Sequence, residues 1–126
     1  MNHRIKHWVL MGGILIMSAC ATPSFPPAAQ PTTAKALHER LVGKTYLGQT
    51  AKGQGWDIHY AADGRLQMRV SSGEADQGRW RAEDNRLCVD FEGKFPSGCS
   101  EMRADTGRLY LQRVSTGEIV VLTPKP

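Results

Sequence analysis

The chain has 126 residues, with 16 Lys and Arg against 12 Asp and Glu and a formal net charge of +4 at pH 7. Arg4 and Lys6 lie in an N-terminal apolar segment, and without them fourteen basic residues face twelve acidic ones, a net charge near +2. The basic residues are interspersed with Asp and Glu, which is typical of a mixed surface and argues against a nucleic-acid partner. A chain of this length has room for one small hydrophobic core.

Residues 1–19 have the layout of a secretory signal peptide. A basic head with Arg4 and Lys6 precedes an apolar stretch from Trp8 to Met17, and small residues follow it. A membrane-spanning helix needs about 20 apolar residues, so this stretch is too short to span a bilayer. We therefore expect residues 1–19 to be removed during export.

The sequence Ile-Met-Ser-Ala-Cys at 16–20 resembles the bacterial lipoprotein box, with Met17 where that family most often has Leu. The resemblance implies cleavage before Cys20, a diacylglyceryl thioether on Cys20 and an acyl chain on its amino group. Two lipid signals are enough for stable membrane anchoring, so these chains would keep the mature protein on a membrane. The alternative is a plain secretory signal with an incidental cysteine. Ala21 stands after the cysteine where Asp would direct retention, which by resemblance to the enteric sorting rule favours the outer membrane, facing the periplasm.

Residues 20–33 are expected to form the lipidated cysteine and a proline-rich tether. Residues 21–33 contain four prolines and no charged residue, a composition that does not build a packed core. Proline-rich chains extend by about 3.1 Å per residue, so this tether would hold a domain up to roughly 40 Å from the membrane. The folded domain is expected over residues 34–126.

A short helix is predicted over residues 35–42, at the start of this domain. Thr33 is its candidate N-cap, and Gly43 follows its last residue, where a helix commonly ends. Leu37 and Leu41 are four positions apart and would lie on one face.

Apolar and polar residues alternate through the rest of the chain. Trp56, Ile58 and Tyr60 would share one strand face. Asp57 and His59 would occupy the other face. The same pattern predicts eight strands, at 44–50, 56–60, 66–70, around Trp80, and at 87–91, 100–104, 108–114 and 118–123.

These short strands and the short turns between them predict an all-β fold. We expect a small antiparallel up-and-down barrel or a strongly curled sheet of about eight strands, preceded by the short helix. A sandwich is the alternative. Closure into a barrel is favoured because it removes the exposed edges that an open sheet would leave.

Cys88 and Cys99 are the only cysteines after Cys20, and an even pair in an exported chain predicts one disulfide. Metal binding is the rival interpretation, but two cysteines with no nearby histidine supply only half of a tetrahedral zinc site. Cys88 alternates with apolar neighbours, so the bridge should lie outside the main core. It would hold the exposed loop of residues 93–98, in which Lys94 and Phe95 are candidate binding residues.

Several short motifs resemble a family of small exported bacterial β-proteins of unassigned function. The motifs are Gly43-Lys44-Thr45, the turn Tyr-Ala-Ala-Asp-Gly-Arg-Leu at 60–66, Gly78-Arg79-Trp80-Arg81, Leu87-Cys88 and Gly98-Cys99. They span roughly residues 43–122. The resemblance implies an all-β fold with a disulfide, and it implies nothing about catalysis.

No group of residues in the sequence indicates an enzyme or a cofactor. His59 is the one histidine of the predicted strands, and with Asp57 it supplies neither a nucleophile nor a complete metal site. No glycine-rich phosphate loop stands between a strand and a helix. We therefore predict a protein without catalytic residues, metal ligands or a cofactor.

The leading hypothesis is a lipid-anchored envelope protein whose β-domain binds an envelope protein or a cell-wall component, or is structural. Besides Lys94 and Phe95, the candidate contacts are arginines on polar strand faces: Arg69, Arg79, Arg81, Arg103 and Arg113. One alternative is an inhibitor of a secreted hydrolase such as lysozyme or a protease. Another is a carrier of a small apolar ligand, which eight-stranded barrels can enclose. In so short a chain, we expect inward-pointing Trp, Met, Phe and Leu side chains to fill the interior.

Overall fold

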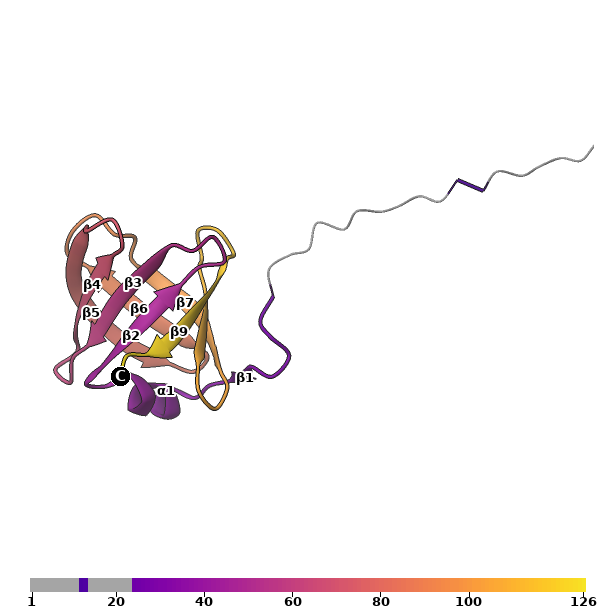
Figure 1. Cartoon of the computed structure of the whole chain (residues 1–126). Helices are drawn as coiled ribbons and strands as arrows, with labels where there is room; N and C mark the ends of the chain where they lie inside the picture. The colour runs from indigo at the N-terminus through magenta and orange to yellow at the C-terminus, as the bar shows by residue number, and fades with distance from the viewer. Residues whose placement is uncertain (1–11, 14–23) are drawn as a thin grey trace, which may run out of the picture.

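A computed structural model describes residues 12–13 and 24–126, and the second range contains a closed antiparallel β-barrel with one short helix (Figure 1). The elements, in chain order, are β1 (Gln30–Pro31), α1 (Ala34–Leu41), β2 (Lys44–Gln49), β3 (Gly55–Tyr60), β4 (Arg65–Val70), β5 (Ala75–Glu83), β6 (Arg86–Phe91), β7 (Gly98–Ala104), β8 (Leu109–Gln112) and β9 (Ile119–Pro124). Cys20 and nearly all of the predicted signal peptide lie outside the described residues.

Strands β2 to β9 form an up-and-down barrel in which each strand pairs with the next one along the chain. The barrel closes where β9 pairs with β2, with Thr123 opposite Leu47. Closure gives each of these strands a partner on both sides. The predicted barrel is thus confirmed, and the sandwich alternative is wrong.

Strand β5 extends over nine residues, whereas the sequence pattern predicts a strand only around Trp80. Gly78 lies within it, where a Cβ atom would stand 1.9 Å from the carbonyl oxygen of Asp90 on β6. Glycine at this position therefore lets the two backbones approach closely, as a tightly curved sheet requires.

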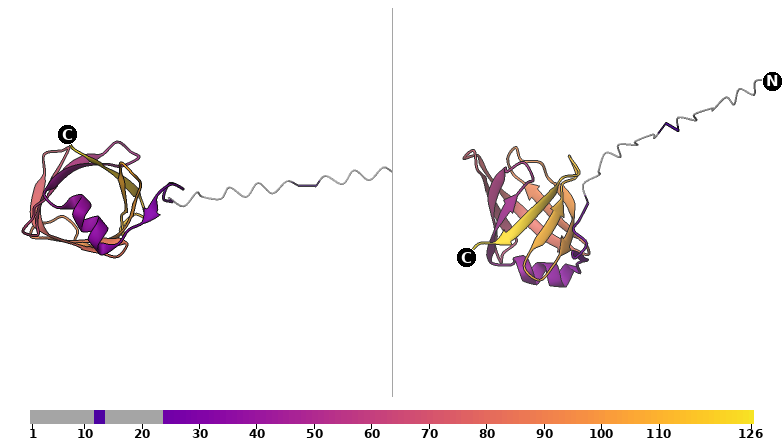
Figure 2. Two further views of the ribbon diagram at one scale, coloured as in Figure 1. Left: turned by 90° about the horizontal axis from the view of Figure 1, so that it is seen from below. Right: turned by 45° about the vertical axis from the view of Figure 1, so that its right-hand side comes forward.

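Helix α1 lies across one end of the barrel (Figure 2). The hydroxyl of Thr33 accepts a hydrogen bond of 3.2 Å from the backbone N–H of Ala36, and Gly43 after the helix has a φ of 72°. Leu37 and Leu41 are fully buried in the barrel core. The predicted helix, its N-cap, its end and its apolar face are all confirmed.

Further contacts hold α1 in place. The Arg40 guanidinium donates 2.8 and 3.4 Å hydrogen bonds to the carbonyls of Asp105 and Arg108, at the turn between β7 and β8. The His38 ring stacks on Trp80 with 5.1 Å between ring centroids. The helix therefore closes this end with both apolar and polar contacts.

Part of the predicted tether belongs to the folded domain. Strand β1 pairs with β7 beyond the end of β6, with Pro31 opposite Arg103. Ala29 is buried, and Phe25 lies 4.8 Å from the Arg103 guanidinium. The proline-rich composition did not indicate this packing. Pairing with the edge of a strand uses backbone groups, so it does not depend on the apolar side chains that a composition reveals.

The disulfide between Cys88 and Cys99 is present, as predicted, and it joins directly opposed positions on β6 and β7. It lies on the outer side of the barrel wall and outside the hydrophobic core cluster. Cys88 is nevertheless only 2% exposed, and its sulfur lies 3.4 Å from the carboxylate of Glu83.

Candidate functional site

The barrel contains an open cavity at the end opposite α1, with a volume of about 520 Å³. Its wall is made by inward side chains of five barrel strands: Trp56, Ile58, Tyr60, Leu66, Met68, Val70, Leu87, Val89, Phe91, Leu111 and Leu122. The loops after β2, β4, β6 and β8 surround the mouth. The expected filled interior is therefore confirmed only for the half of the barrel that α1 closes.

Aromatic side chains fill the closed half. Tyr60 packs edge-on against Tyr46 and Trp80, with ring centroids 6.1 and 5.4 Å apart. The indole N–H of Trp80 donates a 3.0 Å hydrogen bond to the carbonyl of Ala61. Burial, and to a lesser extent the neighbouring Tyr46, raises the pKa of Tyr60, so the base of the cavity stays uncharged at neutral pH.

Two aromatic residues form one side of the mouth. Phe95, from the loop after β6, packs edge-on against Phe91 at 5.5 Å between centroids. The carboxylate of Asp76 holds this loop by accepting hydrogen bonds from the backbone N–H groups of Gly93 and Phe95, at 2.9 and 3.1 Å. Phe95 is thus positioned by the barrel wall as well as by the disulfide.

Two basic residues of the loops around the mouth are paired with carboxylates. Lys94 lies 3.6 Å from Glu74 on the neighbouring loop, and Arg113 lies 3.6 Å from Glu118. The Arg113 guanidinium also stands 5.8 Å from the centre of the Trp56 ring. The predicted residues Lys94, Phe95 and Arg113 therefore all lie around the mouth.

Trp56 has an uncommon environment on the opposite wall. Its indole packs on Gly48, where a Cβ atom would stand 2.3 Å from the indole nitrogen. That nitrogen is buried and has no hydrogen-bond partner among the described residues. The missing side chain at position 48 therefore creates the space that the indole occupies.

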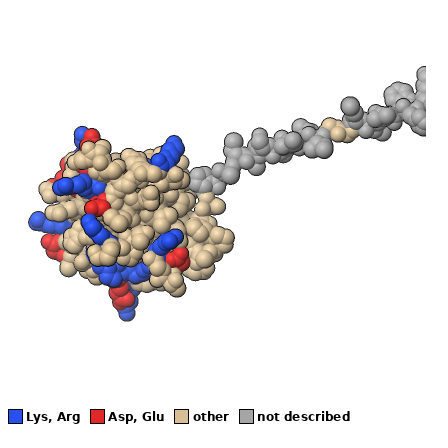
Figure 3. All heavy atoms as spheres, viewed as in Figure 1, with Lys and Arg blue, Asp and Glu red and all other residues tan. Residues whose placement is uncertain are grey.

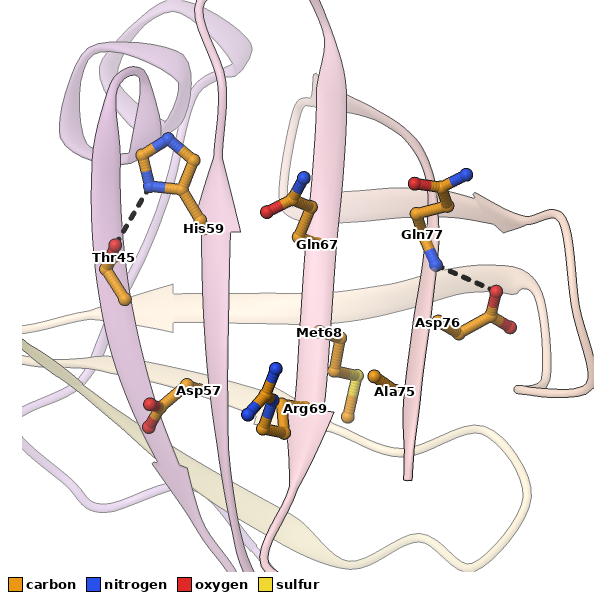
Figure 4. A pocket seen from close by; sticks show the side chains of 9 residues that line it. All are labelled: Thr45, Asp57, His59, Gln67, Met68, Arg69, Ala75, Asp76 and Gln77. Carbon is orange, nitrogen blue, oxygen red and sulfur yellow. Dashed lines mark hydrogen bonds between the residues drawn. The ribbon is translucent and has the colours of Figure 1, made fainter. Parts of the chain in front are cut away.

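A second, shallow hollow lies on the outer surface of β2 to β5 (Figure 4). It is lined by Thr45, Asp57, His59, Gln67, Met68, Arg69, Ala75, Asp76 and Gln77. His59 and Asp57 share this face, as predicted. The His59 Nδ1 hydrogen-bonds the Thr45 hydroxyl at 2.9 Å, while the Asp57 carboxylate accepts a 3.3 Å hydrogen bond from Lys125.

The other predicted arginines do not form one patch. Arg69 lines the outer hollow, and Arg79 lies directly opposite Arg65 on the neighbouring strand. Arg81 is 3.9 Å from Asp90. Arg103 lies on β7, 3.4 Å from Glu101. Basic and acidic residues are interspersed over the visible face (Figure 3).

One cluster of potential metal ligands occurs among the described residues, formed by Glu83, Cys88 and Cys99. The two sulfurs are bonded to each other, whereas zinc binding requires thiolates. The cluster therefore does not supply a metal site in the oxidised protein.

The sequence indicated which side chains point inward, but it did not indicate that one half of the barrel stays open. It also missed Val114, which lies at the mouth and is 75% exposed. The only available signal was the apolar residue in an otherwise polar turn at 113–118.

No protein-family model matches the chain, and no curated protein matches it in sequence. The resemblance to small exported bacterial β-proteins is not tested by these comparisons and stays a prediction. No helix of the described ranges is long and apolar enough to cross a membrane.

Proposed function

We propose that the mature chain is a lipid-anchored protein of the bacterial cell envelope that binds a small apolar ligand in the open end of its barrel, without catalysis. The observation that carries the proposal is the 520 Å³ apolar cavity, which opens at one end of the barrel and ends at buried side chains of the half that α1 closes. Ligand sites typically have volumes of about 300–1,000 Å³ and mainly apolar walls. Apolar burial contributes about 25 cal/mol per Å² removed from water.

The cavity favours a ligand with an uncharged apolar part. Charged groups occur only among the residues of its rim, where Glu74 and Arg113 each have an ion-pair partner. The buried phenol of Tyr60 is neutral. An ion held deep in the cavity would lose its hydration without gaining an opposite charge there, which is costly.

Electrostatic capture of a partner by the wall arginines is less well supported. Arg81 and Arg103 are already paired with carboxylates and remain partly exposed. Exposed ion pairs of this kind contribute about 0–1 kcal/mol each. The charges are also spread over different strands and do not make one complementary surface.

Binding of an apolar fluorescent probe, N-phenyl-1-naphthylamine, to the purified mature protein tests the proposal. We expect saturable binding and displacement by an unlabelled fatty acid. Val70→Trp should fill part of the cavity near its mouth and weaken probe binding at least several-fold. Leu47→Trp adds the same side chain to the outer wall, where Leu47 is 39% exposed, and should leave binding unchanged.

A second cavity-filling variant guards against misfolding. Val89→Trp lies on a different strand of the same cavity, and circular dichroism with urea unfolding shows whether each variant keeps the barrel. Folded Val70→Trp and Val89→Trp proteins that bind the probe as well as the parent would refute the proposed site. Absence of saturable binding to the parent protein would do the same.

A further inference from the structure

We propose that the open end of the barrel rests on the lipid bilayer, so that the cavity opens directly onto lipid. This inference rests on the proposed function, both for the acylated Cys20 and for the apolar ligand. Beyond that function, it specifies the surface of the domain that meets the membrane and the side from which the ligand enters. Three features of the described residues support it.

The first feature is the short distance between the anchor and the barrel. Phe25 already lies against Arg103 on β7, and Cys20 precedes it by only five positions. A fully extended chain spans about 3.4 Å per residue, so Cys20 lies within about 17 Å of Phe25. A six-residue strand is about 20 Å long, so the distance from Phe25 to the anchor is shorter than one barrel strand. An anchor this close holds the barrel against the membrane surface. The reach of roughly 40 Å expected from composition is thereby excluded.

The second feature is the path of the N-terminal segment. The described residues that precede β1 begin beside the end closed by α1 and run next to the barrel for part of the way toward the open end (Figures 1 and 2). The contact of Phe25 with Arg103 and the burial of Ala29 fix this segment to the wall. Arg103 lies one residue before the end of β7 that faces α1, so Phe25 is held nearer the closed end. The five positions back to Cys20 span up to about 17 Å, which suffices to reach the level of the open end.

The third feature is the exposed apolar rim. Val114, at the tip of the loop after β8, is 75% exposed, and the only other exposed large apolar residue of the described part is Leu47 on the outer wall. Phe95 and Pro96 lie across the mouth on the loop after β6. Apolar residues at loop tips gain free energy when they enter the acyl boundary of a bilayer. The opposite end carries the polar contacts of Arg40 with Asp105 and Arg108 instead.

The charges of the rim are compatible with a lipid surface but do not drive the contact. The basic residues Lys52, Lys94 and Arg113 belong to three of the four loops, and long basic side chains can extend their charge to the headgroup level while their stems stay apolar. The acidic residues Glu74 and Glu118 are paired with two of them. We therefore expect docking by apolar insertion, with weak dependence on salt.

Docking in this orientation gives the ligand a path that avoids water. An acyl chain or similar apolar molecule could enter the cavity from the bilayer through the ring of loops, without exposing its length to solvent. The rim residues would then contact lipid, and the cavity would sample molecules dissolved in the membrane.

Fluorescence quenching by lipid-borne nitroxides tests the orientation. The lipidated full-length mature protein is reconstituted through its own acyl chains in phosphatidylethanolamine and phosphatidylglycerol vesicles. Ser115→Cys places a single free thiol on the rim, because Cys88 and Cys99 are bonded to each other, and Glu39→Cys places one on the exposed side of α1. Each is labelled with the same fluorophore. We expect several-fold stronger quenching at position 115 than at position 39.

A paired substitution identifies the residue that inserts. Val114→Asp in the Ser115→Cys protein should reduce quenching several-fold, whereas Leu47→Asp should leave it unchanged, because Leu47 lies on the outer wall. Equal quenching at both labels, stronger quenching at position 39, or no quenching at either would overturn the proposal. The last result would indicate that a protein partner or solvent meets the rim.

The same samples separate this inference from the proposed function. Quenching at position 115 without saturable probe binding would keep the orientation and remove the ligand-binding function. Probe binding without quenching at position 115 would keep the function and remove the orientation. A mature chain whose Cys20 is not acylated, shown by its intact mass, would overturn the inference because the anchor is one of its premises.

Discussion

The carboxylate of Asp76, near the start of β5, accepts a 3.1 Å hydrogen bond from the backbone N–H of Phe95 at the mouth of the cavity. A side chain of the barrel wall thereby fixes the position of an aromatic residue of the proposed ligand site. The same carboxylate accepts a second bond from Gly93 and a third from Gln77. The loop of residues 93–98 is therefore held by Asp76 at one strand and by the disulfide at its end.

This arrangement predicts that the mouth loosens in acid. Desolvation raises the pKa of Asp76, but bonds from three backbone N–H groups outweigh it and lower the pKa below its ordinary value of 3.8. The folded state therefore binds the proton less readily than the unfolded state. The ionised Asp76 carboxylate contributes its full stabilisation of the folded state above pH 3.8. This contribution is lost as the pH falls below that value through the folded-state pKa.

We expect the protection factors of the Gly93 and Phe95 amides, which compare their exchange with that of an unstructured chain at the same pH, to fall in that acid range. In Asp76→Asn they should be low already at neutral pH. Nuclear magnetic resonance measures both amides directly. Asp90→Asn is the control, because Asp90 is an exposed carboxylate near Arg81. Unchanged exchange at both amides in Asp76→Asn would show that another contact holds the loop.

Loss of the disulfide should destabilise the barrel without changing its fold. The bridge joins residues at a sequence separation of 11, and the chain-entropy model assigns such a loop about 2.5 to 3 kcal/mol. The variant Cys88→Ala/Cys99→Ala should lose about this amount in urea unfolding. Dithiothreitol should produce a similar loss in the parent protein and none in the variant. A reductant effect on the variant would mean that the loss has another origin.

Substitution of Gly78 should test the close approach of β5 and β6. A Cβ atom at this position would meet backbone atoms, which cannot rotate away. Overpacking usually lowers the free energy of unfolding by about 1–3 kcal/mol. Gly78→Ala should lower it by an amount at or above the top of this range. Gly107→Ala is the matched control, since a Cβ atom at position 107 would have no neighbour within 4 Å among the described residues. Equal unfolding midpoints for the two variants would contradict this reason for glycine.

The closure of the barrel by α1 should depend on its two buried leucines. Leu41→Ala should reduce the free energy of unfolding by about 2–5 kcal/mol, because it leaves a cavity between the helix and the strands. Glu39→Ala changes the exposed side of the same helix and should stay within about 0.5 kcal/mol of the parent. Chemical denaturation followed by circular dichroism measures both. A small effect of Leu41→Ala would show that the barrel does not need its helical closure.

Gly48 should control the shape of the ligand site through Trp56. In Gly48→Ala the added methyl group would overlap the indole, which must then move. We expect a change in tryptophan emission and a several-fold change in affinity for the apolar probe. Gly55→Ala is the control, because its Cβ atom would meet only one backbone oxygen at an ordinary distance of 3.5 Å. Identical probe affinities for Gly48→Ala and the parent would remove Trp56 from the site.

Local patterns predicted much of the fold. Alternation placed Ile58, Tyr60 and Trp80 inside the barrel, and the capping residue Thr33 placed the helix within one residue of its actual start. These predictions succeed because the period of side-chain direction in a strand and the capping of a helix depend on neighbouring residues. The candidate site was less predictable: Lys94, Phe95 and Arg113 meet around the mouth, whereas Arg69, Arg79 and Arg81 lie elsewhere on the wall.

The sequence by itself determined the class of the fold, the strand faces, the helix and the cysteine pair, because each of these follows from residue type and short-range spacing. Only the tertiary structure decided that α1 closes one end, that the other end holds a cavity, and that residues 25–33 pack against the wall. These features depend on how much side-chain volume meets at each level of the closed barrel and on which strand edge remains unpaired. Such quantities arise only when residues far apart in the chain, such as Pro31 and Arg103, are brought together.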